Sequence, residues 1–179
     1  MAASSPIPAA EATLLLGDES ATAQLGRAIA AWLDAHRDHV AAQGFVVWLR
    51  GDLGAGKTTL VRALLRALGV TGPVKSPTFT LLEPYVISSL NFYHFDFYRF
   101  SETAEFDDSG FRELLGKGSV CLIEWPERAQ DRLPTADLAV TLQTKDNGRS
   151  AHCVATGEAG ARCLQQAIAT MQETPVGGG

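Results

Sequence analysis

Long apolar runs are absent from the 179-residue sequence, and their absence excludes a membrane protein of the helical kind. No stretch approaches the roughly 18 consecutive apolar residues that a membrane span needs. The N-terminal segment has no basic region, and its apolar run is limited to Leu14, Leu15 and Leu16, so we expect no signal peptide. These absences favour a cytoplasmic protein that does not associate with a membrane.

Cysteine is scarce, and the spacing of the few that occur argues against two kinds of site. The three residues, Cys121, Cys153 and Cys163, are odd in number and form no C-x-x-C pair. A disulfide framework or a zinc knuckle is therefore not expected. We expect all three to be small buried apolar residues.

An excess of basic residues is also lacking. Fifteen lysines and arginines face twenty aspartates and glutamates, for a formal net charge of -5. This balance argues against a broad basic face that grips nucleic acid unaided. A nucleic acid could still be reached through a partner protein.

No repeat and no linker divides the sequence, so we expect one domain over residues 12–173 between disordered ends at 1–11 and 174–179. Strands are expected at residues 12–16, 45–49, 78–86, 91–97, 120–123, 137–143 and 150–155. Helices are expected from an N-cap at Ser20 to just before Gly44, and at 57–68, 111–115 and 160–172. This alternation, with a late hairpin at residues 146–148, predicts an α/β fold with a central mixed, largely parallel β-sheet flanked by helices.

One motif carries most of the functional information. Residues 51–58, GDLGAGKT, match G-x-x-x-x-G-K-[ST], the P-loop pattern, between a buried strand and a helix. Glycines let the backbone wrap a phosphate, and the helix N-terminus adds a positive dipole. Lys57 would reach the β- and γ-phosphates, and the Thr58 hydroxyl would ligate Mg²⁺. The residues expected to bind ATP with Mg²⁺ are Gly51, Asp52, Leu53, Gly54, Ala55, Gly56, Lys57, Thr58 and Thr59.

A P-loop needs an acid to hold or orient Mg²⁺, usually at the end of a neighbouring strand. Glu124 ends the apolar run of residues 121–123 and fits that role, although a surface glutamate at a strand end would give the same pattern. Asp96 shares one face of an alternating strand with His94 and Tyr98. That polar row could be either a functional face or a solvent-exposed one.

Four blocks in order match one known family: GDLGAGKTT from Gly51, SPTF from Ser76, HFDFYR from His94 and IEWPE from Ile123. On these blocks the sequence resembles the TsaE family, also called YjeE, over roughly residues 12–170. Members of that family are small ATPases of bacterial tRNA threonylcarbamoyladenosine synthesis. The residues between Tyr85 and Phe92 look slightly extended relative to the family pattern, which leaves the strand register there open.

The resemblance implies a P-loop fold and a role for several residues. Lys57, Asp96 and Glu124 would be catalytic, and Thr58, Glu124 and Asp96 would hold or position Mg²⁺. Residues 76–79 would form a switch-like loop that senses the γ-phosphate. Thr22 and Arg149 would be further contacts to the nucleotide. Trp125, next to the metal acid, would be either a site residue or plain core.

The resemblance also implies partners. The family works with TsaB and TsaD, and TsaD performs the transfer to the adenosine beside the anticodon. The ATPase would be weak alone and stimulated by this pair, and tRNA would be contacted only indirectly.

Two other P-loop functions remain as alternatives. A small-molecule kinase would need an acceptor pocket and an arginine-rich lid, but the eleven arginines form no cluster in the sequence. A regulatory GTPase would use the D-x-x-G at residues 107–110, yet no buried strand precedes it and no N-K-x-D follows. We therefore favour the ATPase, with the kinase as the main alternative.

Overall fold

The computed structural model describes residues 10–100, 104–146 and 148–173. The ends expected to be disordered lie outside these ranges, except that the first strand begins at Ala10, two residues before its expected start. Asn147, in the turn of the expected late hairpin, is also outside the described residues.

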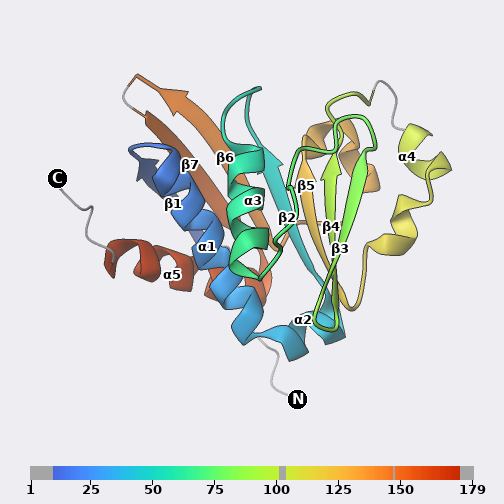
Figure 1. Cartoon of the computed structure of the whole chain (residues 1–179), viewed down its shortest axis with the longest axis horizontal. Helices are drawn as coiled ribbons and strands as arrows, with labels where there is room; N and C mark the ends of the chain where they lie inside the picture. Colours follow the sequence, from blue (N-terminus) through green and yellow to red (C-terminus); the bar gives the residue numbers. More distant parts are fainter. Residues whose placement is uncertain (1–9, 101–103, 147, 174–179) are drawn as a thin grey trace, which may run out of the picture.

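A seven-stranded sheet runs through the middle of the molecule (Figure 1). Its strands are β1 (Ala10–Leu16), β2 (Phe45–Arg50), β3 (Leu82–Ile87), β4 (Leu90–Asp96), β5 (Ser119–Glu124), β6 (Leu138–Lys145) and β7 (Gly148–Ala155), in the order β1-β7-β6-β2-β5-β4-β3. The central strands β6, β2, β5 and β4 are parallel, whereas β1, β7 and β3 pair antiparallel with their neighbours. The predicted mixed sheet with a parallel centre is confirmed, as is the β6–β7 hairpin.

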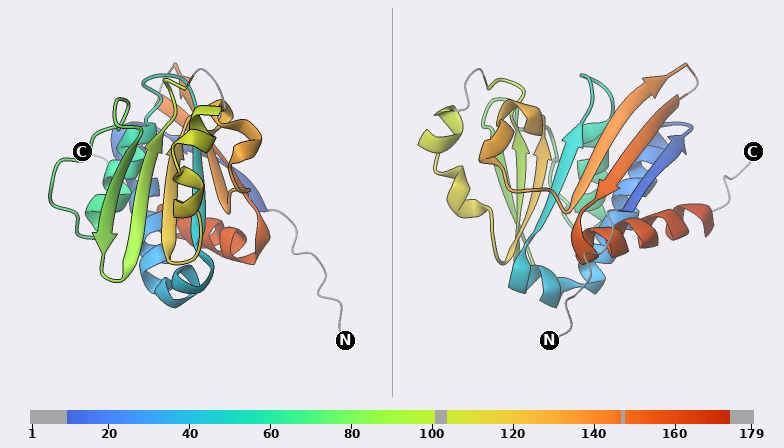
Figure 2. Two further views of the ribbon diagram at one scale, coloured as in Figure 1. Left: turned by 90° about the vertical axis from the view of Figure 1, so that its right-hand side faces the viewer. Right: turned by 180° about the vertical axis from the view of Figure 1, so that it is seen from behind.

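Helices cover the two faces of the sheet unequally (Figures 1 and 2). One face carries α1 (Glu19–Ala35), α3 (Lys57–Ala67) and α5 (Gly157–Glu173), with α2 (Arg37–Gln43) following α1. The other face carries α4 (Ala104–Asp108) and the 3₁₀ turns η1 (Phe111–Leu114), η2 (Pro126–Arg128) and η3 (Gln130–Arg132), only over the β2–β5–β4 side. Among the described residues, no helix combines the length and apolarity needed to cross a membrane.

Each face of the sheet has its own apolar core. The core under α1, α3 and α5 includes Trp32, Leu60 and Leu164. The opposite core is largely aromatic and contains Phe95, Phe97, Phe100, Phe106 and Phe111. Because β2, β5 and β4 are covered on both sides, their carboxyl ends are held in fixed relative positions.

The three cysteines are buried and free, as expected. Burial raises the pKa of the thiols of Cys121, Cys153 and Cys163 to about 12. Such thiols stay protonated at neutral pH and are poor nucleophiles.

The first helix differs from its prediction at both ends. Asp18, not Ser20, is the N-cap, and its Oδ1 accepts a hydrogen bond of 2.9 Å from the Ala21 N–H. The single helix expected up to Gly44 is broken at His36, whose Nδ1 lies 2.8 Å from the Trp32 carbonyl oxygen. The imidazole thus bonds to a carbonyl near the end of α1 and marks the boundary between α1 and α2.

The strand predicted from Thr78 begins only at Leu82. Leu81 has a φ of 64°, and its N–H donates to the Pro77 carbonyl oxygen at 2.7 Å, which turns the chain away from the sheet. The register after this turn pairs Ile87 with Leu90 across a two-residue connection. Residues 78–81 are therefore a loop at the edge of the sheet.

Close packing of α1 on α3 predicts a stability effect at Gly26. A Cβ atom there would lie 2.4 Å from the Leu60 carbonyl oxygen and 3.2 Å from the Ala63 Cβ. Although alanine favours helix by about 1 kcal/mol, we expect Gly26→Ala to lower the free energy of unfolding by about 1–3 kcal/mol, because the helices must separate. Urea unfolding measures this. Gly17→Ala, with no atom within 4 Å of the added Cβ, is the control, and an equal loss in both variants would contradict the prediction.

Candidate functional site

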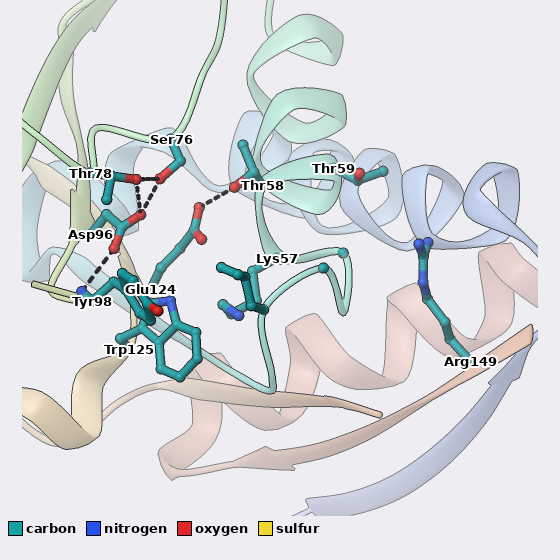
Figure 3. Close-up of a pocket in the computed structure, with 13 residues that line it drawn as sticks. Lys57, Thr58, Thr59, Ser76, Thr78, Asp96, Tyr98, Glu124, Trp125 and Arg149 are labelled. Atoms are coloured by element: carbon teal, nitrogen blue, oxygen red, sulfur yellow. Dashed lines mark hydrogen bonds between the residues drawn. The ribbon is translucent and has the colours of Figure 1, made fainter. Parts of the chain in front are cut away.

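The carboxyl ends of β2, β5 and β4 meet at one edge of the sheet. In register, Leu49 of β2 pairs with Glu124 of β5, which pairs with Asp96 of β4. The P-loop follows β2 directly and leads into α3. A pocket of about 260 Å³ opens here, between the P-loop, the loop that contains Ser76 and Thr78, and the two acids (Figure 3).

Lys57 is folded back onto the P-loop. Its Nζ donates to the Gly51 carbonyl oxygen at 2.6 Å and to the Asp52 carbonyl oxygen at 2.9 Å. The same ammonium lies 4.1 Å from the centroid of the Trp125 ring. Burial lowers the pKa of Lys57, and the negative charges of Glu124 and Asp96 act in the opposite direction.

Two glycines of the motif have conformations that other residues rarely adopt. Gly51 has a φ of 131°, and a Cβ on it would lie 2.3 Å from the Leu142 carbonyl oxygen. Gly56 has a φ of 110° and caps α3 without any side-chain hydrogen bond to the helix N-terminus. The first N–H groups of α3 are thus not capped by a side chain, as an anion-binding helix terminus requires.

Glu124 is the centre of a short hydrogen-bond network. Its Oε1 accepts from the Thr58 hydroxyl at 2.8 Å and lies 2.8 Å from His94 Nε2. The residue is 2% exposed. The alternative interpretation of Glu124 as a surface glutamate is therefore wrong.

Asp96 is tied to the loop that contains Ser76 and Thr78. Its Oδ2 accepts from the Ser76 hydroxyl and, at 3.1 Å, from the Thr78 hydroxyl, while its Oδ1 accepts from the Tyr98 N–H at 2.9 Å (Figure 3). Asp96 and His94 are 3% and 0% exposed, so the solvent-face interpretation of this row holds only for Tyr98. The loop of residues 76–79 is attached through its hydroxyls to the acid at the end of β4.

Thr22 and Arg149 meet at the other side of the P-loop. Arg149 lines the pocket and lies well apart from Asp96 and Glu124 (Figure 3). Its Nη1 donates to the Thr22 hydroxyl at 3.4 Å, and both side chains approach Gly56. The two residues, 127 positions apart in sequence, therefore lie together beside the P-loop.

Most of the predicted site residues line the pocket. The lining includes Leu53, Gly54, Gly56, Lys57, Thr58, Thr59, Asp96, Glu124 and Arg149, whereas Gly51, Asp52, Ala55 and Thr22 do not line the pocket. Sequence reasoning gave no role to His94, although its position two residues before Asp96 put it on the same face. Trp125 also lines the pocket, with a left-handed φ of 58° that is unusual for a residue with a side chain.

The acids and the hydroxyl fit a magnesium ion held jointly with a phosphate. Within the described ranges, no group of three or more His, Cys, Asp or Glu side chains could hold a metal by itself. Mg²⁺ at phosphate sites uses one or two protein carboxylates and takes its other ligands from water and phosphate. Since a hydroxyl has one proton and two lone pairs, Thr58 can donate to Glu124 and still offer a lone pair to a cation.

The D-x-x-G sequence at residues 107–110 lies outside the pocket. Asp107 and Asp108 are the last two residues of α4, on the outer side of the aromatic core. Asp107 forms salt bridges with Arg112 and Arg132. Neither aspartate lines the pocket. The geometry gives no support to the GTPase alternative.

Known proteins of one family are similar to this chain over most of its length. The sequence profile of the family described as "Threonylcarbamoyl adenosine biosynthesis protein TsaE" matches residues 16–151. The "tRNA threonylcarbamoyladenosine biosynthesis protein TsaE" of Haemophilus influenzae is 45% identical over 113 residues, 63% of this chain and 72% of that protein. The protein of the same description from Bacillus subtilis is 40% identical over 103 residues, 58% of this chain and 64% of that protein.

Two further comparisons cover more of the chain. The TsaE protein of a Nostoc species is 36% identical over 141 residues, 75% of this chain and 80% of that protein. A crystal structure of Bacillus subtilis YdiB superposes with a TM-score of 0.71 at 26% identity, over 91% of this chain and 97% of that one. With most of its length matched by the family profile, and with the P-loop and both acids at one sheet edge, the chain belongs to the TsaE family.

Proposed function

We propose that this chain is the Mg²⁺-dependent ATP-binding and ATP-hydrolysing subunit of the bacterial tRNA threonylcarbamoyladenosine machinery. Its membership of the TsaE family supports a role in that biosynthesis. The single observation that carries the nucleotide part is the meeting of Lys57, Thr58, Glu124 and Asp96 in one pocket at the ends of three parallel strands.

The P-loop side of the pocket would bind the phosphates. The uncapped N-terminus of α3 and the Lys57 ammonium supply positive charge, and phosphate oxygens would replace the Gly51 and Asp52 carbonyls as partners of Lys57. Arg149, on the other side of Gly56 from the acids, would contact the nucleotide away from the γ-phosphate, with Thr22 holding the guanidinium.

The acidic side of the pocket would carry the chemistry. Thr58 and Glu124 would hold Mg²⁺, which neutralises charge on the β- and γ-phosphates. Asp96 would help position the metal or the attacking water, and its bonds to Ser76 and Thr78 would link occupancy of the site to the loop of residues 76–79.

The chain would act with TsaB and TsaD, as the family does. Its role would be to dock on that pair and reset it between cycles, while tRNA is contacted by the partner. A formal charge of -5 is compatible with this division, since a protein that grips tRNA itself usually carries a basic surface.

Replacement of Lys57 tests the nucleotide assignment. We expect Lys57→Ala to weaken Mg²⁺-ATP binding by about 2–4 kcal/mol, or about 30- to 700-fold, because one charged partner of the phosphates is lost. Isothermal titration calorimetry on the folded variant gives the affinity.

Lys117→Ala is the matched control for this measurement. Lys117 is exposed and precedes β5, at the opposite edge of the sheet from the pocket. Its removal should leave ATP affinity at the parent value. Unchanged affinity in folded Lys57→Ala would overturn the phosphate assignment.

A further inference from the structure

His94 is a buried histidine with an unusual set of partners. It sits on β4 two residues before Asp96 and is 0% exposed. Its Nε2 lies 2.8 Å from Glu124 Oε1, whereas its buried Nδ1 has no hydrogen-bond partner among the described residues. An ionised carboxylate only accepts, so the Nε2 proton is the one donated, and this assignment follows from the hydrogen-bond network.

A histidine with these partners stabilises the core less than an apolar side chain would. A buried ring nitrogen without a partner lowers stability, and an apolar ring of similar size would avoid that loss. The imidazole contributes one thing that an apolar ring cannot, which is the hydrogen bond to Glu124.

The bond to His94 fixes how the Glu124 carboxylate faces the pocket. Oε1 accepts from two directions, from Thr58 on α3 and from His94 on β4. Oε2 has no partner among the described protein groups, and Glu124 lines the pocket. With Oε1 held by two donors from different elements, Oε2 is the oxygen left to face a cation.

We propose that His94 is a positioning residue. Its hydrogen bond to Oε1 of Glu124 orients the carboxylate so that Oε2 faces the pocket. In this way His94 sets how strongly Mg²⁺ supports nucleotide binding. The proposal rests on the function proposed above, because it assigns Glu124 to the Mg²⁺ side of the nucleotide site. Outer partners of metal-binding carboxylates typically change metal affinity by about 10- to 100-fold when removed.

Two substitutions separate the hydrogen bond from simple packing. His94→Gln keeps a donor near the Nε2 position, whereas His94→Phe keeps a ring without a donor. The affinity of a non-hydrolysable ATP analogue is measured by calorimetry without Mg²⁺ and across a MgCl₂ titration. Thermal unfolding shows that each variant is folded, and His94→Met replaces His94→Phe if the latter does not fold.

We expect His94→Phe to keep the parent affinity without Mg²⁺ and to need about 10- to 100-fold more Mg²⁺ for the half-maximal effect. His94→Gln should stay close to the parent. A parent-like Mg²⁺ dependence in His94→Phe, or an equal loss in both variants, would overturn the proposal while leaving the function intact. Failure of the parent protein itself to bind the analogue would instead overturn the proposed function.

Discussion

Glu124→Gln is expected to lower the rate of ATP hydrolysis, measured at saturating Mg²⁺ with TsaB and TsaD present, by about 10²–10³-fold, while nucleotide binding at the same Mg²⁺ concentration is retained. The carboxylate is buried, shared between Thr58 and His94, and faces the pocket. Its charge matters most as charge redistributes around the γ-phosphate in the transition state, and an amide of the same shape lacks that charge. The expected result therefore differs in kind from Lys57→Ala, which weakens binding itself.

The experiment compares phosphate release and calorimetric affinity in the same preparations. Glu113→Gln is the control, since Glu113 is exposed in η1 on the outer layer. It should behave as the parent in both assays. Hydrolysis at the parent rate in Glu124→Gln would remove Glu124 from the chemistry.

The parts of the fold that sequence predicts well are those with local causes. The P-loop combines glycines, a lysine and a threonine at fixed spacing, and each of these is needed by the backbone or by the phosphate. The strand ending in Glu124 was recognisable because a buried parallel strand reads as a continuous apolar run. The buried strand is confirmed, and residues 51–56 connect β2 to α3 as the motif predicts.

The parts that sequence misses have causes that the pattern of residue types does not display. The predicted strand from Thr78 fails because the Thr78 hydroxyl bonds to Asp96, eighteen residues away, and the chain turns at Leu81. The helix break falls at His36, which is neither glycine nor proline, and whose imidazole bonds to the Trp32 carbonyl oxygen. The short helix α4 carries too few residues for periodicity to reveal it.

The residues of the candidate site also divide into those that the sequence predicts and those that it misses. Lys57 and Thr58 follow from one motif, whereas Thr22 and Arg149 are named only by the family resemblance, and their hydrogen bond to each other is seen only in the structure. The burial of His94 against Glu124 followed from neither. Its alternation with Asp96 is visible in the sequence, but a solvent face gives the same alternation, and only the burial of His94 and Asp96 distinguishes the two.

The prediction that ATP hydrolysis depends on partners rests on the positions of the arginines. Among the arginines of the described residues, Arg149 alone lines the pocket, and it lies on the far side of the P-loop from Glu124 and Asp96. Arg99, the other candidate, has its guanidinium 4.2 Å from the centroid of the exposed Phe79 ring and does not line the pocket. No described arginine therefore reaches the side of the pocket where the γ-phosphate would react.

A P-loop enzyme without an arginine at that position hydrolyses slowly, and an arginine supplied in trans raises the rate by about 10³–10⁵-fold. We expect the isolated chain to show a barely measurable ATPase rate and the TsaB–TsaD pair to raise it strongly, up to that range if the pair supplies an arginine. The exposed side chains at the pocket rim, Leu53 and Tyr98, leave the site open to such a partner.

The most direct test is the steady-state rate of phosphate release from Mg²⁺-ATP by the purified chain alone and with TsaB and TsaD added together. Lys57→Ala with the same partners gives the background of each preparation. The expected result is a rate near background alone and a large increase with both partners that Lys57→Ala does not show. A full rate from the isolated chain, unchanged by the partners, would contradict the proposed function and favour a stand-alone nucleotidase or a small-molecule kinase.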